Sequence, residues 1–217
     1  MKTLFRALVV LAALSPLACS AADTNAPYKL GEHYLRVRAF QEPAVPGKVE
    51  VMEVYAYSCP HCFNLEPVMA KWLKSKPADV EFVRTPNTLG DDKNEMRNRA
   101  YYAARMLGVA DRFHPALFEA MHRDRKPMAT PEALRALFVE TTGLKGQDFD
   151  GAVNSFAADA SFRRGESAAQ AMGITRVPTL VVDGKYMIPA SLAKSYDDML
   201  KVVDFLVGEA RKERAKR

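Results

Sequence analysis

The chain has 217 residues, of which 48% are hydrophobic and 26% are charged, as is typical of a globular protein. The formal net charge of +5 falls to about +3 without Lys2 and Arg6 of the N-terminal segment. Such a weak positive charge does not favour nucleic-acid binding, and we expect none.

The first 22 residues have the pattern of a secretory signal peptide. Lys2 and Arg6 precede an apolar run over residues 7–14, and small residues follow as far as Ala22. The apolar run is too short to cross a bilayer. We therefore assign residues 1–22 to a signal peptide that is cleaved near Ala22, and expect the mature protein where disulfides persist.

Cys19 leaves an alternative open within this segment. If Cys19 is lipidated, the protein is anchored to a membrane rather than released. A lipoprotein signal has an aliphatic residue three positions before the cysteine and a small one two positions before it, whereas this chain has Pro16 and Leu17 there. Ordinary cleavage is the favoured interpretation.

The next segment predicts a strand followed by a helix. Residues 49–57 are rich in β-branched and aromatic side chains, which indicates a strand, and it ends at the Ser-Cys-Pro-His-Cys sequence of residues 58–62. Apolar residues then recur at helical spacing over residues 63–73. Pro60 suits the first helical turn, where its missing N–H costs nothing. A second strand is predicted over residues 80–86.

No strand-like pattern occurs between residues 95 and 172, and the spacing of apolar residues predicts helices there. Thr130 followed by proline is a typical helix start. The predicted helices are separated by glycine and proline and cover residues 96–107, 111–121, 130–142 and 149–172.

Strand character resumes at residues 178–182, and Asp183-Gly184 predicts a hairpin turn to a return strand over residues 185–188. A final helix is predicted from Leu192 to about Lys212. The order of elements is therefore β-β-α-β, a helical block, and β-β-α.

An α/β domain with an inserted all-helical domain explains this order, because each part then has its own core. We predict residues 28–92 and 173–212 as the α/β domain and residues 93–172 as the insertion.

Without Cys19, the mature chain has one closely spaced cysteine pair, Cys59 and Cys62. Closing so short a loop adds little stability, so reactivity explains the pair better. A thiolate at a helix N-terminus is stabilised by free N–H groups and the helix dipole. His61 adds an electrostatic partner. We expect Cys59 to be the exposed, ionised sulfur and Cys62 the deeper one.

Two other interpretations of the pair are weaker. A zinc site needs two further cysteines or histidines at ligand spacing, which His33, His114 and His122 do not supply. An inert buried pair does not suit an exposed junction between a strand and a helix. We therefore expect no metal at the site.

Cys59-Pro60-His61-Cys62, the strand before it, the helical block and the sequence of residues 176–179 resemble the DsbA family of periplasmic disulfide-forming proteins. The resemblance extends over about residues 28–208. It implies a thioredoxin fold with an inserted helical domain.

The resemblance also implies an enzyme, a protein disulfide oxidoreductase that donates its Cys59–Cys62 disulfide to newly exported proteins. It implies a periplasmic monomer whose substrates are reduced, unfolded exported proteins. The redox-active disulfide serves in place of a cofactor, and a membrane-embedded reoxidase of the DsbB type restores it.

Family roles can be carried over to individual residues. Cys59 matches the nucleophilic cysteine and Cys62 the resolving one, while Pro60 and His61 match the dipeptide that tunes the redox potential. These four residues are the first part of the expected catalytic site.

Four further residues match the family outside this motif. Val177 and Pro178 match a substrate-binding segment whose peptide bond is cis in the family. Glu53 matches a buried acid and Glu66 an acid of the active-site helix, and both can assist proton transfer to Cys62. A solvated Glu66 is the alternative.

Other functions remain open from the sequence. An isomerase of the DsbC type carries an N-terminal dimerisation domain, for which the stretch between Asp23 and Val49 leaves no room. A reductant of the thioredoxin type usually has Gly-Pro between its cysteines. A peptide-binding chaperone does not need two cysteines at this spacing.

Overall fold

A computed structural model describes residues 26–216 of the chain. The predicted signal peptide and Cys19 lie outside these residues. The described chain forms a sheet in the order β1-β5-β4-β2-β3, in which β2 and β3 are parallel and the other neighbours antiparallel. The strands are β1 (Leu35–Arg36), β2 (Val49–Tyr55), β3 (Val80–Pro86), β4 (Thr179–Val182) and β5 (Tyr186–Pro189).

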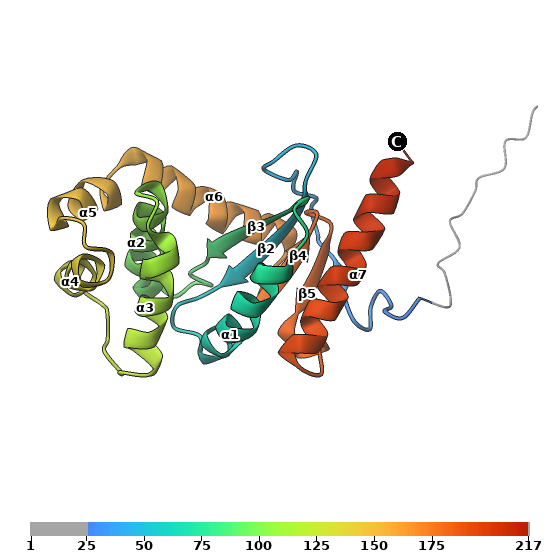
Figure 1. Cartoon of the computed structure of the whole chain (residues 1–217), viewed down its shortest axis with the longest axis horizontal. Helices are drawn as coiled ribbons and strands as arrows, with labels where there is room; N and C mark the ends of the chain where they lie inside the picture. The colour runs from blue at the N-terminus through green and yellow to red at the C-terminus, as the bar shows by residue number, and fades with distance from the viewer. Residues whose placement is uncertain (1–25, 217) are drawn as a thin grey trace, which may run out of the picture.

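Helices cover both faces of the sheet (Figure 1). On one face, α1 (Pro60–Ser75) and α7 (Tyr196–Ala215) pack against apolar side chains such as Val51. On the other, the C-terminal half of α6 (Phe156–Met172) packs against Val54. Because side chains alternate along β2, Glu53 faces the same side as Val51, beneath α1. This alternation brings a carboxyl group under the active-site helix.

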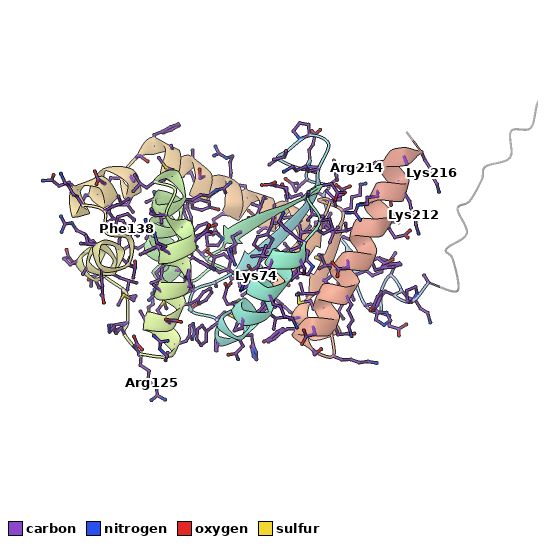
Figure 2. The ribbon with its side chains drawn as sticks, viewed as in Figure 1. Lys74, Arg125, Phe138, Lys212, Arg214 and Lys216 are labelled. Carbon is purple, nitrogen blue, oxygen red and sulfur yellow. The ribbon has the colours of Figure 1, made fainter. Side chains whose placement is uncertain are left out.

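The helical block lies beside the sheet, between β3 and β4 in the chain (Figure 1). Its core is aromatic, and Phe138 lies within it, fully buried (Figure 2). Apart from α6, the helices of the block are α2 (Glu95–Met106), α3 (Ala110–His122), α4 (Pro131–Thr142) and α5 (Gly146–Val153).

The prediction of one helix over residues 149–172 was wrong, because the structure divides this stretch into α5 and α6. The reason is local hydrogen bonding at the junction. The Ser155 hydroxyl accepts from the backbone N–H of Ala158 and caps α6, while the Asn154 side chain donates to the Asp150 carbonyl at the end of α5. Side chains of this kind compete with helix continuation.

The start of the final helix was also predicted too early. Residues 190–192 form a 3-10 turn, and α7 begins at Tyr196 after Ser195, whose hydroxyl accepts from the Asp198 backbone N–H. The predicted hairpin turn is confirmed: Asp183 and Gly184 have φ values of 53° and 61°, as the tight turn between β4 and β5 requires. No helix within residues 26–216 is long and apolar enough to cross a membrane.

Candidate active site

The junction between β2 and α1 positions the two cysteines. Cys59 is the N-cap of α1 in an extended conformation, and Pro60 occupies the first helical turn, as predicted. The Cys59 sulfur accepts a hydrogen bond from the Cys62 backbone N–H at 3.3 Å. Cys59 is half-buried, whereas Cys62 is fully buried, and both are thiols in this structure. The N-cap position therefore directs free helix N–H groups at one accessible sulfur.

The two thiols differ strongly in acidity. A hydrogen bond from the Cys62 thiol, together with backbone hydrogen bonds from Cys62 and His61, outweighs burial and lowers the pKa of Cys59 to about 6. The positive charge of His61 makes a smaller contribution. Burial and the neighbouring Cys59 raise the pKa of the Cys62 thiol. At neutral pH the accessible sulfur is thus a thiolate and the buried sulfur a thiol.

Val177 and Pro178 lie beside this pair although they are distant in the sequence. The Cys59 sulfur is 3.7 Å from the Val177 carbonyl oxygen, and the Val177–Pro178 bond is cis. Val177, Pro178 and His61 line a shallow cavity of about 270 Å³, together with Arg176 and Tyr196. The Tyr196 hydroxyl also approaches His61 Nδ1 at 3.5 Å. Val177 thus both lines this cavity and contacts the sulfur of Cys59.

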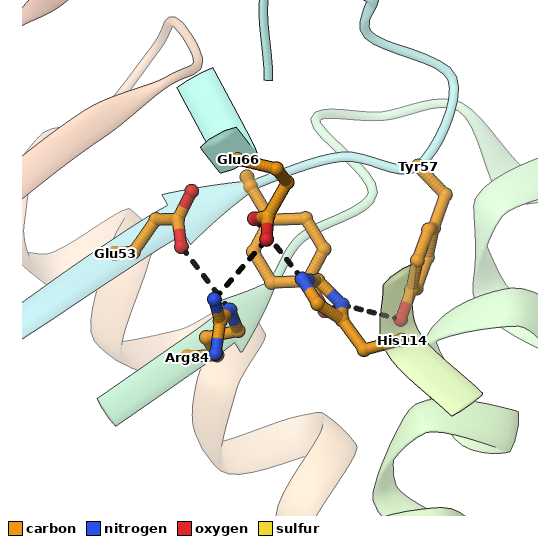
Figure 3. Close-up of polar contacts among 6 residues, drawn as sticks. Glu53, Tyr57, Glu66, Arg84 and His114 are labelled. Atoms are coloured by element: carbon orange, nitrogen blue, oxygen red, sulfur yellow. Dashed lines mark hydrogen bonds and ion pairs between the residues drawn. The ribbon is translucent and has the colours of Figure 1, made fainter. Parts of the chain in front are cut away.

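Figure 3 shows a largely buried group of charged residues from β2, α1 and β3. Arg84 stands opposite Glu53 in the parallel pairing of β2 and β3, and its Nε lies 3.4 Å from Glu53 Oε2. The same guanidinium donates to Glu66 Oε2 at 3.1 Å. Arg84 therefore bridges the two carboxyl groups that the sequence had singled out.

The helical insertion contributes a further member, His114 of α3. Its Nε2 is 3.1 Å from Glu66 Oε1, and its Nδ1 is 2.9 Å from the Tyr57 hydroxyl (Figure 3). The Tyr55 hydroxyl is 3.3 Å from the same Nδ1. Both oxygens of Glu66 thus have partners, one from β3 and one from the insertion.

The two carboxyl groups differ in acidity as the two thiols do. Burial and the nearby Glu66 outweigh Arg84 and raise the pKa of Glu53 to about 8. Burial also acts on Glu66, but hydrogen bonds and charge interactions with His114 and Arg84 overcome it and lower the pKa of Glu66. Glu53 in turn is one of the groups that raise the pKa of Cys62.

The structure places the six other predicted site residues around the cysteine pair, some at the surface and some in the interior. Pro60 and His61 are exposed beside Cys59, whereas Glu53 is fully buried beneath α1. Glu66 is largely buried and bonded rather than solvated, so the alternative of a solvated side chain was wrong.

Sequence reasoning missed Arg84 and His114. The signal for His114 is a polar residue on the apolar face of a predicted helix, between Phe113 and Leu117, both of which are fully buried. The signal for Arg84 appears only when β2 and β3 are paired, because Glu53 and Arg84 then stand opposite each other.

Among residues 26–216, no group of three or more histidine, cysteine or acidic side chains is arranged to hold a metal ion.

A strand that delivers an acidic thiol to a helix start, a second thiol one turn deeper and a helical block inserted after β3 define a dithiol protein of the thioredoxin type. The DSBA-like thioredoxin domain family matches residues 50–201 of the chain. The chain belongs to this family. The predicted fold class, a thioredoxin fold with an inserted all-helical domain, is thereby confirmed.

The relatives agree with this assignment. The chain is 35% identical over 205 residues to the thiol:disulfide interchange protein DsbA of Pseudomonas aeruginosa, covering 94% of each chain, and 34% identical to that of Azotobacter vinelandii, covering 86% of each. The crystal structure of Pseudomonas aeruginosa DsbA superposes with a TM-score of 0.80 at 34% identity, covering 88% of this chain and 97% of that one. The oxidoreductase DsbA from Xylella fastidiosa gives a TM-score of 0.77 at 29% identity, with 84% and 97% covered.

Proposed function

We propose that this chain oxidises pairs of thiols in newly exported proteins by giving them the disulfide formed between Cys59 and Cys62. Membership of the DSBA-like family makes the chain a thiol:disulfide oxidoreductase. The observation that carries the direction of exchange is the N-cap position of Cys59, whose sulfur accepts from the Cys62 N–H and whose pKa is lowered to about 6. Interactions that stabilise the thiolate favour the reduced protein, and its disulfide is therefore a stronger oxidant.

The exchange takes place in two steps. A substrate thiolate attacks the Cys59 sulfur of the disulfide, forming a mixed disulfide, and the electron pair of the broken S–S bond goes to Cys62. Because Cys62 is buried and its thiolate is unfavourable, it takes up a proton. A second substrate thiolate then attacks the substrate sulfur of the mixed disulfide and releases Cys59 as a thiolate. The substrate gains a disulfide, and the cysteine pair gains the two electrons.

The other residues around the pair have separate roles in this proposal. Pro60 and His61 tune the stability of the Cys59 thiolate, and Val177 and Pro178 hold the substrate backbone along the shallow cavity beside Cys59. The contact between Cys59 and the Val177 carbonyl supports this position for the substrate. Glu53 supplies the proton that Cys62 needs, because it is buried nearby and remains protonated at neutral pH.

The setting of the protein is part of the proposal. We place it in the periplasm as a monomer, with its signal peptide cleaved near Ala22 and not anchored through Cys19, on the pattern of the first 22 residues. Its partners are reduced, unfolded exported proteins and a membrane-embedded reoxidase of the DsbB type. The disulfide of the chain itself takes the place of a cofactor.

The test is the equilibrium of the purified protein with glutathione, combined with its action on a reduced, unfolded substrate protein. We expect the dithiol form to predominate in glutathione mixtures that leave ordinary structural disulfides oxidised, and we expect the disulfide form to oxidise the substrate stoichiometrically. Cys59→Ser is the control. A pair that stays oxidised in excess reduced glutathione indicates a reductant, and action on scrambled disulfides alone indicates an isomerase; either result would overturn the proposal.

A further inference from the structure

The largely buried group of Glu53, Glu66 and Arg84 has two carboxyl groups but one cation. Glu53 and Glu66 contribute two carboxyl groups, and Arg84 is the cation that contacts both. Burial of an uncompensated second negative charge is costly, so one carboxyl has to keep a proton. Which of the two keeps it matters for Cys62, because a charge on Glu53 acts on the Cys62 thiol.

The hydrogen bonds distinguish the two carboxyl groups. Glu66 has a partner on each oxygen, His114 on Oε1 and Arg84 on Oε2. Both Glu53 oxygens are buried, and neither accepts a hydrogen bond from a residue that the structure describes, although Arg84 Nε lies at 3.4 Å. Hydrogen bonds donated to a carboxylate favour its ionised form. The geometry therefore favours the negative charge on Glu66 and the proton on Glu53.

His114 is neutral in this arrangement. It is fully buried, and burial lowers its pKa despite the adjacent Glu66. A neutral imidazole has one N–H, and a Glu66 carboxylate requires that N–H on Nε2. Nδ1 then accepts from the Tyr57 hydroxyl at 2.9 Å. The Glu66 carboxylate, which can only accept, therefore sets the tautomer, and the tyrosine hydroxyl is compatible with it as the donor to Nδ1.

We propose that His114 is a positioning residue of the exchange reaction: by donating from Nε2 to Glu66 it holds the negative charge there and keeps Glu53 as the protonated carboxyl near Cys62. This inference rests on the proposed function. When the Cys59–Cys62 bond breaks, the O–H bond of Glu53 breaks and an S–H bond forms at Cys62. The Glu53 carboxylate left behind lies beside Arg84.

The groups that face His114 come from α1, α2, α3, β2, β3 and the loop after β2. Glu66 of α1, Arg84 of β3 and Asp111 of α3 act on its charge. The rings of Tyr55, Tyr57 and Tyr101 surround it at centroid distances of 5.1 to 5.7 Å. The tyrosines stay neutral, because burial raises the pKa of each. Arg84 and Glu66 are therefore the charges through which a change at His114 reaches Glu53.

Two substitutions separate the hydrogen bond from the ring. His114→Leu removes the donor, whereas His114→Gln keeps an amide N–H at a reach similar to that of Nε2. His122→Gln is the matched control, because it lies on the same helix and its Nε2 contacts the Tyr57 backbone oxygen at 2.8 Å rather than a carboxylate. If His114→Leu fails to fold, His114→Asn, whose amide is one bond shorter, replaces it in the comparison with His114→Gln.

The measurement is the carbon-13 carboxyl titration of the reduced protein with labelled glutamate, in which the Glu53 signal is assigned by its loss in Glu53→Gln. We expect Glu53 to titrate near pH 8 in the wild type. Its midpoint should fall by about one pH unit or more in His114→Leu, a tenfold change in the equilibrium. His114→Gln and His122→Gln should keep the wild-type midpoint.

An unchanged Glu53 midpoint in His114→Leu would overturn the proposal. Equal falls in His114→Leu and His114→Gln would also overturn it, since the ring and not its N–H would then be responsible, and a fall in His122→Gln would show a general effect of altering α3. The proposed function fails separately, if the wild-type disulfide does not oxidise a dithiol peptide.

A kinetic experiment connects the titration to the reaction. Glu53 can donate a proton only while it is protonated, that is, below its pKa. Above about pH 8, loss of this proton should therefore limit the rate at which a thiol opens the disulfide of the wild type. In His114→Leu this limit should begin at a lower pH and move with the Glu53 midpoint. A rate reduced equally at every pH would indicate a structural role and contradict the proposal.

Discussion

Cys59 and Cys62 lie within one turn of α1, but their surroundings have opposite effects on the pKa of the two thiols. Cys59 accepts hydrogen bonds from the Cys62 thiol and from backbone N–H groups at the helix start, which stabilise its negative charge, and His61 contributes less. Cys62 lies in a closed interior, where Arg84 and Glu66 already hold charge and Glu53 keeps a proton. The comparison teaches that the pKa of the accessible sulfur is set by hydrogen bonds donated to it at the helix start, whereas the buried sulfur depends on the placement of a proton.

The largest effect should come from replacing either cysteine by serine. Cys59→Ser should abolish substrate oxidation, because the attacked and attacking sulfur is lost. Cys62→Ser should instead leave a reactive Cys59 that accumulates mixed disulfides with thiol substrates. Mass spectrometry of the trapped species checks both outcomes, and adducts at Cys62 in the Cys59→Ser variant would contradict the assignment of roles.

The buried side of the comparison should be sensitive to loss of its cation. Arg84→Met leaves two buried carboxyl groups without compensation, and breaking a buried ion pair in this way costs about 3–5 kcal/mol of folding free energy. Urea unfolding of the dithiol form measures the loss. Arg84→Lys, which keeps the charge but not the two-sided contact, should lose less; an Arg84→Met variant as stable as the wild type would show that the carboxyl groups protonate at little cost.

Glu53 should give the stability an unusual dependence on pH. Its pKa is about 8 in the folded chain and about 4.3 in an unfolded one, so its contribution is fully present below about pH 4 and is lost as the pH rises toward 8. Relative to Glu53→Gln, the wild type should lose up to about 1.4 kcal/mol per pH unit in this window.

Urea unfolding of both dithiol proteins between pH 5 and pH 8 checks this prediction. The difference between the two curves isolates Glu53, because the remaining ionisable groups are common to both. A difference that does not change with pH would mean that Glu53 is ionised throughout.

The smallest effects concern the low pKa of Cys59 and should show which of its causes contributes most. Because the hydrogen bond from the Cys62 thiol is the largest cause of the low pKa of Cys59, Cys62→Ala should raise that pKa more than His61→Ala does. Absorbance of the thiolate against pH measures both shifts. His61→Ala should also move the glutathione equilibrium several-fold toward the disulfide, where 30 mV corresponds to about 1.4 kcal/mol. The reverse ranking would assign the tuning to the imidazole.

The two sides also differ in how far they could be predicted from the sequence. The exposed side is local: a strand, a helix start and Cys59-Pro60-His61-Cys62 follow one another in the chain, so periodicity and spacing suffice. On the buried side, Glu53 and Glu66 were found through the family resemblance. Arg84 was not found, because its role depends on strand pairing.

The helical block shows the same limit. The pattern gave its helices but missed the break at Asn154 and Ser155, since side-chain capping there overrides an apolar periodicity that continues through it. His114 was weighed only as a metal ligand. Its partner Glu66 is 48 positions away, and no spacing rule connects a residue of α3 to one of α1.

Because α3 belongs to the block between β3 and β4, the insertion carries one half of a buried hydrogen bond whose other half is in the active-site helix. A chimaera that exchanged residues 93–172 for the block of another protein would keep every atom of Cys59-Pro60-His61-Cys62 and still replace the partner of Glu66. Transplanting the motif and transplanting its acid–base chemistry are therefore different operations in this molecule, and the second requires the insertion to move with the motif.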